Sequence, residues 1–219
     1  MNANRRIAVL TGDLIGSKKA DAHEITKTFQ LIETTTREYG DKRGFDPRFT
    51  RFRGDGWQVI QPEPGLILDF VLTIVSRLRA SQESIETRIA VGVGEYTTLG
   101  TRDLSDASGD AFFLSGRAIE RMSPKRQLYI TGDGIGPSEE ALGHLCSFIA
   151  NSWTSTQATA VALALDPSRP KHHEIAEKLA ITRQAVQSRL SGAGYPEIEA
   201  AVQAFMLNEF NIDKEGKVL

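Results

Sequence analysis

The sequence has only one cysteine, Cys146, in 219 residues, and its formal net charge is only −2. One cysteine cannot form an internal disulfide, which excludes a secreted scaffold held together by disulfides. No apolar run approaches the roughly 20 residues that a membrane-spanning helix needs, and the N-terminus lacks the apolar segment of a signal peptide. The small net charge excludes nucleic-acid binding by bulk charge, so any such contact requires a local patch. We therefore expect a soluble, cytoplasmic protein without membrane contact.

The first part of the chain has the pattern of an α/β sheet domain. An apolar strand at 7–11 is followed by a helix behind a capping-box pattern. Two short strands then flank Gly54-Asp55-Gly56, a strong hairpin signal. A second helix and an apolar strand at 88–93, ended by Gly94, follow. This order of strand, helix, hairpin, helix and strand predicts a ferredoxin-like sheet, extended by a helix near 110–122 and a strand at 127–131.

The pattern changes after residue 151, where short helices replace strands. We therefore expect an α/β (α+β) ferredoxin-like sheet domain followed by a small all-α domain. The predicted division is a sheet domain at 1–136, a connecting helix at 137–152, a helical domain at 153–210 and a frayed tail at 211–219.

Two of the short helices, within residues 174–190, have a helix-turn-helix layout. Ile175, Ala176 and Leu179 on the first helix, and Val186 and Leu190 on the second, are expected to face inward. The second helix, expected to begin with Thr182 as its N-cap, then presents side chains that can reach phosphates and base edges in a major groove: Thr182, Arg183, Gln184, Gln187, Ser188 and Arg189. This segment resembles the DNA-reading domain of sigma-factor-like bacterial regulators, which implies DNA as a partner. The alternative is a plain helical hairpin used for packing or dimerisation.

Two aspartates lie at the ends of strands in the predicted sheet. Asp13 ends the first strand and Asp55 lies at the tip of the hairpin. In a ferredoxin-like sheet the first strand lies beside the hairpin, so both carboxylates should meet at one edge. Two hard oxygen ligands, completed by substrate phosphates, suit Mg²⁺ or Mn²⁺. Each aspartate alone also fits a simple role in a turn.

These motifs resemble the catalytic domain of class III nucleotidyl cyclases, a palm-type fold. The resemblance covers roughly residues 5–131. It implies that Asp13 and Asp55 bind metal, that Arg51 contacts the base, that Asp106 selects the base, and that Arg117 stabilises the pentavalent phosphorus. It also implies a homodimer, because the metal ligands and the arginine of such cyclases come from opposite subunits. Phe113 stands where that family has a transition-state Asn, and a phenyl ring cannot donate a hydrogen bond.

The combination of the two parts also resembles the SatD family of bacterial proteins. Three functions follow as hypotheses. The first is a DNA-binding transcriptional regulator whose cyclase-like domain senses a nucleotide with a divalent metal. The second is an active Mg²⁺- or Mn²⁺-dependent nucleotidyl cyclase or nucleotidyltransferase acting on nucleoside triphosphates. The third is a degenerate palm domain that serves as a dimerisation platform.

Overall fold

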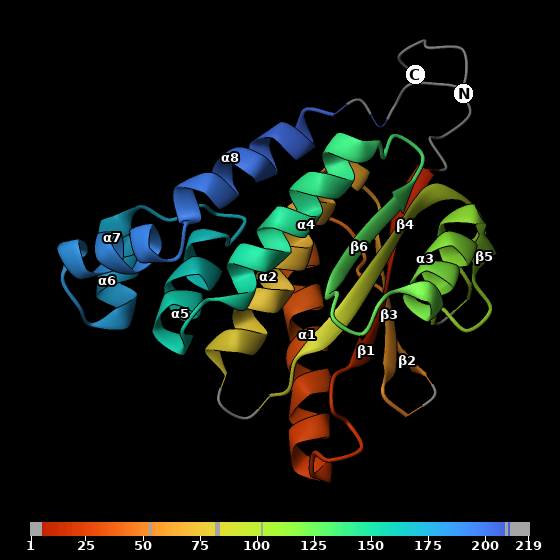
Figure 1. Cartoon of the computed structure of the whole chain (residues 1–219), viewed down its shortest axis with the longest axis horizontal. Coiled ribbons are helices and arrows are strands. Elements are labelled where there is room, and N and C mark those ends of the chain that lie inside the picture. Colours follow the sequence, from red (N-terminus) through yellow and green to blue (C-terminus); the bar gives the residue numbers. More distant parts are fainter. Residues whose placement is uncertain (1–5, 53, 82–83, 102, 209, 211–219) are drawn as a thin grey trace.

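The computed structural model describes residues 6–52, 54–81, 84–101, 103–208 and 210, so the predicted tail at 211–219 lies outside the described residues. The chain forms a mixed sheet covered by helices, with a group of short helices at one end (Figure 1). The strands are β1 (Arg6–Leu14), β2 (Phe49–Phe52), β3 (Gly56–Gln61), β4 (Thr87–Thr98), β5 (Ser108–Gly109) and β6 (Leu128–Gly132). The helices are α1 (Ala22–Arg43), the short 3₁₀ helix η1 (Pro64–Leu66), α2 (Ile67–Ala80), α3 (Asp110–Arg121), α4 (Pro137–Asn151), α5 (Ser155–Ala164), α6 (His172–Leu179), α7 (Arg183–Gly192) and α8 (Tyr195–Met206).

The strand order confirms the expected ferredoxin-like arrangement. The four main strands run β2-β3-β1-β4 with antiparallel pairing, and β6 adds in parallel to β4. Asp13 of β1 is registered opposite Gly56 of β3 and opposite Arg88 of β4. Since side chains alternate between the two faces of a strand, Thr11 and Asp13 share the face that carries Val9.

The sheet is covered on both faces by different helices. One face packs Ala8, Leu10 and Val91 into a core shared with α1, α2 and α4. The other face packs Val9 and Ile60 against α3 in a smaller core. The prediction that Gly94 ends the fourth strand was wrong, because β4 continues through Gly94 to Thr98.

Glycine in β4 allows α3 to lie directly on the sheet. A Cβ at Gly92 would fall within 3.0 Å of Ala111, Leu114 and Ser115 of α3. Any larger residue at this position would therefore push the helix outward. This close packing fixes α3 over β4 and leaves room on either side of the helix.

The C-terminal part contains α5 to α8, and no strand occurs among its described residues, as predicted. Its buried side chains, such as Val161 and Phe205, belong to the same continuous core as Phe70 of α2. The helical unit therefore packs against the sheet domain and does not hang from a free linker. Within the described residues, no helix combines the length and the apolar character that crossing a bilayer would require.

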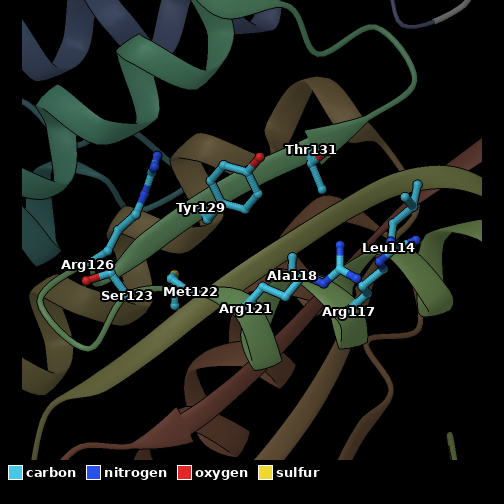
Figure 2. A pocket seen from close by; sticks show the side chains of 9 residues that line it. All are labelled: Leu114, Arg117, Ala118, Arg121, Met122, Ser123, Arg126, Tyr129 and Thr131. Carbon is cyan, nitrogen blue, oxygen red and sulfur yellow. The ribbon is translucent and has the colours of Figure 1, made fainter.

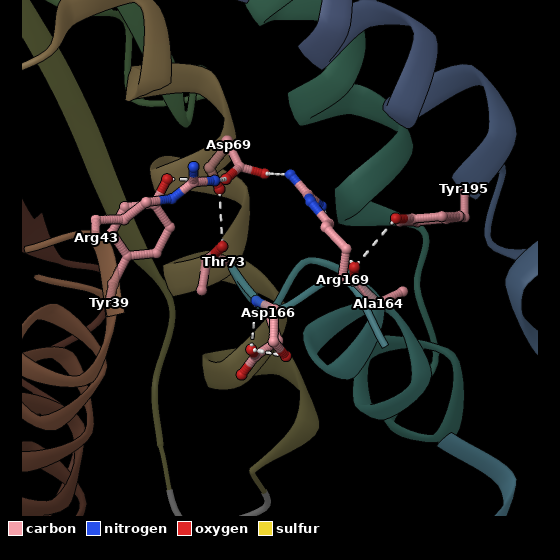
Figure 3. A network of polar contacts seen from close by, with 9 residues as sticks. Tyr39, Arg43, Asp69, Thr73, Ala164, Asp166, Arg169 and Tyr195 are labelled. Atoms are coloured by element: carbon pink, nitrogen blue, oxygen red, sulfur yellow. Dashed lines mark hydrogen bonds and ion pairs between the residues drawn. The ribbon is translucent and has the colours of Figure 1, made fainter. Parts of the chain in front are cut away.

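A buried charged network joins the C-terminal helices to α1 and α2 (Figure 3). Asp69 of α2 has a fully buried side chain that accepts hydrogen bonds from the Tyr39 hydroxyl at 2.8 Å and from the Arg43 guanidinium at 3.4 Å. Its second oxygen pairs with Arg169, which lies in the loop between α5 and α6. Arg169 adopts a left-handed backbone conformation with φ of 47°, an unfavourable geometry for a residue with a side chain.

A second ion pair joins the same loop to α1. Lys42 of α1 pairs with Asp166, which also accepts a hydrogen bond from the Ser168 hydroxyl at 2.7 Å. Burial by itself would raise the pKa of Asp166, but the hydrogen bonds from Lys42 and Ser168 outweigh burial and lower this pKa to about 2. The α5–α6 loop is thus held to the sheet domain by two charged contacts.

Candidate functional site: an acidic cavity beside α3

A cavity of about 710 Å³ lies on the α3 face of the sheet, between α3, β1 and the β2–β3 hairpin. Asp13 and Asp55 both line it, so the structure brings these two sequence-predicted residues together. Asp103 and Glu120 add two further carboxylates to its lining. Among the described residues, however, no group of three or more His, Cys, Asp or Glu side chains is arranged to hold a metal ion.

The carboxylate of Asp13 is held by an arginine on the neighbouring strand. Arg88 donates from Nε to Asp13 Oδ1 at 2.9 Å and from Nη2 to Asp13 Oδ2, a two-point guanidinium–carboxylate pair. The hydrogen bond to Asp13 raises the pKa of Arg88, burial opposes the shift, and the charges of Asp13 and Asp55 add to it. Asp13 keeps a side-chain exposure of 30%, so ligands in the cavity can reach it. Arg88 therefore orients Asp13 and places one positive charge beside two acids.

Asp55 is positioned from the loop that follows β1. Ser17 donates its hydroxyl proton to Asp55 Oδ2 at 2.6 Å, and the backbone N–H of Leu14 donates to the Asp55 carbonyl at 3.1 Å. The hairpin tip is thereby fastened to the end of β1. The two aspartates are held at one edge by contacts between segments about 40 residues apart in the chain.

The residues beneath the aspartates are packed closely. The indole of Trp57 is fully buried, and a Cβ at Gly12 would lie within 3.0 Å of three of its ring atoms. Trp57 Nε1 donates to Thr87 Oγ1 at 2.9 Å, and this hydroxyl donates to the Asp13 carbonyl at 2.8 Å. Gly12 therefore makes room for the tryptophan that supports the backbone of Asp13.

A polar network joins the floor of the cavity to α3. Thr11 Oγ1 lies 2.8 Å from Ser115 Oγ, both side chains being buried, and Gln58 Nε2 donates to Thr11 Oγ1 at 3.0 Å. These contacts connect β1, β3 and α3 at one point. The helix that forms one wall of the cavity is therefore tied to the strand that carries Asp13.

The structure orients two other predicted residues away from the aspartates. Arg51 is among the residues that line the cavity, but its guanidinium carbon lies 4.1 Å from the ring centroid of Phe29 in α1, which covers the opposite face. It also donates to the Gly54 carbonyl at 2.9 Å. Asp106 is exposed in the loop before β5, where it accepts hydrogen bonds from the Thr101 backbone N–H at 3.2 Å and hydroxyl at 3.0 Å. The base-reading roles of Arg51 and Asp106 stay predictions.

Arg117 lies on the far side of α3 from the aspartates. It lines a second cavity, of about 430 Å³, between α3 and β6 (Figure 2). Its guanidinium carbon is 5.9 Å from the ring centroid of Phe113, whose exposure is 63%. One copy of the chain therefore separates Arg117 from Asp13 and Asp55, and the predicted role of Arg117 stays a prediction.

The predicted DNA-contacting side chains lie together on α7 and its N-cap. Thr182, Arg183, Gln184, Gln187 and Ser188 are exposed, whereas Arg189 is half-buried. The Thr182 hydroxyl accepts a hydrogen bond from the backbone N–H of Ala185 at 3.1 Å and thereby caps α7, as expected. Of the five residues expected to face inward, Ile175, Ala176, Val186 and Leu190 are buried, and Leu179 is half-buried. Ala180, between α6 and α7, adopts a left-handed conformation with φ of 51°.

Sequence reasoning missed Arg88 and Ser17, which hold the two aspartates. Arg88 was assigned only to the start of an apolar strand, and its role depends on the β1–β4 register that places it opposite Asp13. Ser17 lies four positions after Asp13, but no local pattern indicates its hydrogen bond to Asp55. Neither contact could be read from spacing in the sequence.

No protein-family model matches the sequence, and no curated protein matches it. Several solved structures are similar over part of the chain. The guanylate cyclase domain of RhGC from Catenaria anguillulae in complex with GTP shares 16% identity and covers 58% of this chain and 78% of its own, with a TM-score of 0.45. The dimeric guanylyl cyclase domain of the RhoGC fusion protein from Blastocladiella emersonii shares 14% identity and covers 57% of this chain and 78% of its own, with a TM-score of 0.44. The adenylyl cyclase CyaB from P. aeruginosa shares 14% identity and covers 57% of this chain and 76% of its own, with a TM-score of 0.37. These overlaps are partial, so the function below is argued from the side chains of this chain.

Proposed function

We propose that the protein is a DNA-binding regulator whose sheet domain binds a nucleoside triphosphate together with Mg²⁺ or Mn²⁺. The observation that carries this proposal is the convergence of Asp13 and Asp55 on one cavity, with Arg88 beside them. A cavity of about 710 Å³ has the size of sites that hold small organic ligands. The motif resemblance around both aspartates points to a nucleotide as that ligand.

The charge of the cavity supports a requirement for a divalent cation. Its described lining includes four carboxylates, those of Asp13, Asp55, Asp103 and Glu120. Arg88 also lines the cavity, and its guanidinium contacts the Asp13 carboxylate. Such a surface repels a polyphosphate unless cations offset the negative charge. A divalent ion, when bound, would neutralise phosphate charge and polarise a phosphoryl oxygen.

The donor set fits Mg²⁺ or Mn²⁺ held by few protein ligands. Mg²⁺ commonly uses one or two carboxylates and takes its remaining ligands from phosphates and water. Asp13 and Asp55 supply two carboxylates, and each carboxylate can accept more bonds than Arg88 and Ser17 donate. In this proposal Arg88 keeps Asp13 oriented while Ser17 orients Asp55.

The exposed face of α7 supports DNA as the second partner. Arg183 and Arg189 can contact phosphates, and Gln184 and Gln187 can pair with base edges. Figure 1 places α6 and α7 at the end of the molecule away from α3 and β5, where a duplex can approach. A homodimer would present two such helices to two half-sites.

The shared core supports communication between the two parts. The cavity rests on β1 and α3, while α2 on the opposite face packs against α5. A shift of the sheet on ligand binding would move α2 and hence α5. The C-terminal helices, which include α7, would move with α5. Comparing DNA affinity with and without nucleotide gives the sign of this coupling. By linkage, DNA changes the affinity for nucleotide by the same factor as nucleotide changes the affinity for DNA.

An active cyclase or nucleotidyltransferase is the second candidate, and one observation bears on it. Because Arg117 lies across α3 from the aspartates, an active site containing all three needs Arg117 from a second copy of the chain. The ribose 3′-hydroxyl would attack the α-phosphorus and pyrophosphate would leave, while Arg117 stabilises the developing charge. The exposure of Phe113 instead favours the third candidate, a palm domain used for dimerisation.

One experiment separates these functions. Binding of each nucleoside triphosphate, with Mg²⁺ or Mn²⁺ and with EDTA, is measured by calorimetry, and the products are analysed by mass spectrometry. The regulator predicts metal-dependent binding that is lost in the Asp13→Asn/Asp55→Asn variant and retained in Asp41→Asn, an exposed acid on α1. A cyclic or oligomeric product absent from the double variant would establish the enzyme. Absence of nucleotide binding would leave the dimerisation platform.

DNA binding is tested with duplexes selected from a random pool. Fluorescence anisotropy should show weaker binding by Arg183→Ala/Gln187→Ala and unchanged binding by Gln203→Ala, an exposed position on α8. Failure to select any duplex would refute the DNA-binding role. Equal DNA affinity with and without nucleotide in the wild-type protein would refute the coupling.

A further inference from the structure

The second cavity, between α3 and β6, differs from the first in charge. Three arginines line it, and none of its described lining residues is acidic (Figure 2). Arg117 and Arg121 come from α3, and Arg126 precedes β6. The remaining lining consists of Leu114, Ala118, Met122, Ser123, Tyr129 and Thr131.

One of these arginines is already neutralised and fixed. Arg126 pairs with Glu140 of α4, and its guanidinium carbon lies 4.6 Å from the ring centroid of Tyr129. Burial lowers the pKa of Arg126, although an arginine stays protonated in proteins. Arg126 therefore serves to fix the Tyr129 ring at the cavity wall and adds little net charge.

The other two arginines are left without a compensating acid. Arg117 and Arg121 are exposed and make no ion pair with any residue that the structure describes. They lie four residues apart on α3, a spacing that places two side chains on the same face of a helix. Two like charges at this spacing repel each other. An anion bound between them would remove that repulsion, and guanidinium groups match the geometry of phosphate oxygens.

The rest of the lining suits the organic part of a ligand. Leu114 and Ala118 of α3, Met122 directly after α3, and the ring of Tyr129 in β6 offer apolar surface to the cavity. The hydroxyls of Ser123 and Thr131 can donate hydrogen bonds. A volume of about 430 Å³ lies in the range of sites that hold small organic molecules.

We propose that this cavity binds a small phosphate ester, with the phosphate held by Arg117 and Arg121 and the organic group packed against Leu114, Met122 and Tyr129. One copy of the chain supplies all of these residues. Because the lining is basic, binding here needs no divalent cation, in contrast to the acidic cavity. The inference is therefore independent of the proposed regulator function, and the two can fail separately.

The test uses phenyl phosphate as the probe, titrated by calorimetry into the full chain in the presence of EDTA. We expect one site, with binding weakened about tenfold or more in Arg121→Gln because a charge-assisted hydrogen bond is lost. Lys125→Gln is the matched control, because Lys125 is an exposed cation near the cavity that does not line it. Its affinity should equal that of the wild type.

Two further arms complete the design. The Asp13→Asn/Asp55→Asn variant should bind phenyl phosphate normally, since the acidic cavity is not involved. Inorganic phosphate should bind more weakly than phenyl phosphate, since it makes no apolar contact. Absence of binding, equal binding by Arg121→Gln in a folded protein, loss of binding in the double aspartate variant, or equal affinity for inorganic phosphate would each overturn the proposal.

Discussion

Replacing Asp69 with alanine is expected to destabilise the protein strongly, because Asp69 joins three elements. Its side chain has 0% exposure and accepts hydrogen bonds from Tyr39, Arg43 and Arg169. Removing one partner of a buried ion pair commonly costs about 3–5 kcal/mol, since the remaining charge stays desolvated. Arg43 and Arg169 keep 24% and 35% side-chain exposure, so water solvates them in part. We therefore expect the lower end, about 3 kcal/mol.

Urea unfolding followed by far-UV circular dichroism measures this loss. For a chain of this size, about 3 kcal/mol corresponds to a fall in Tm of roughly 6–12 °C. Asp41→Ala, which removes an exposed carboxylate from α1, should change the free energy of unfolding by less than about 0.5 kcal/mol.

A double-mutant cycle tests whether Arg169 is the partner that matters. Combining Asp69→Ala with Arg169→Met should cost less than the sum of the single losses, by about 1 kcal/mol or more, because the two residues contact each other. A loss below about 1 kcal/mol for Asp69→Ala, or strict additivity with Arg169→Met, would refute the reasoning that this network holds the C-terminal helices in place.

Three further outcomes are expected. Gly12→Ala should lower the free energy of unfolding by about 1–3 kcal/mol, because its methyl group would overlap the buried Trp57 ring; an unchanged urea midpoint would contradict this packing. Because the pKa of Asp166 is lowered to about 2 from an ordinary 3.8, its contact with Lys42 should stabilise the fold fully above the ordinary value and progressively less as the pH falls towards 2. The urea midpoint of Lys42→Gln should therefore fall less than that of the wild type between pH 3.8 and 2. The same pH dependence of the midpoint in the variant and the wild type would count against this role of the ion pair. Burial raises the pKa of Cys146 to about 11, so Ellman's reagent at pH 8 should react slowly with the folded protein and rapidly in urea; rapid reaction without urea would show that the thiol is accessible.

Local patterns in the sequence predicted most of the elements and their order. The capping box at Asp21, the glycine-flanked hairpin tip at Asp55 and the Thr182 cap all occur as expected. Such features depend on residues a few positions apart, so spacing alone indicates them. The order of strands and helices then restricts the sheet to few topologies, which is why the meeting of Asp13 and Asp55 could be predicted.

Spacing in the sequence could not indicate which side of α3 each residue would occupy. The cyclase resemblance assigned Asp13 and Arg117 to one reaction, with Arg117 supplied by a second subunit. Within one copy, Gly92 lets α3 lie on β4 so that the helix separates the two residues into an acidic and a basic cavity. The Arg88–Asp13 pair depends on strand register, and the Asp69–Arg169 pair joins residues 100 positions apart. Composition and short-range spacing determined the elements and the candidate residues. Only the tertiary structure decided which charges meet, because those contacts arise from packing between segments that are distant in the chain.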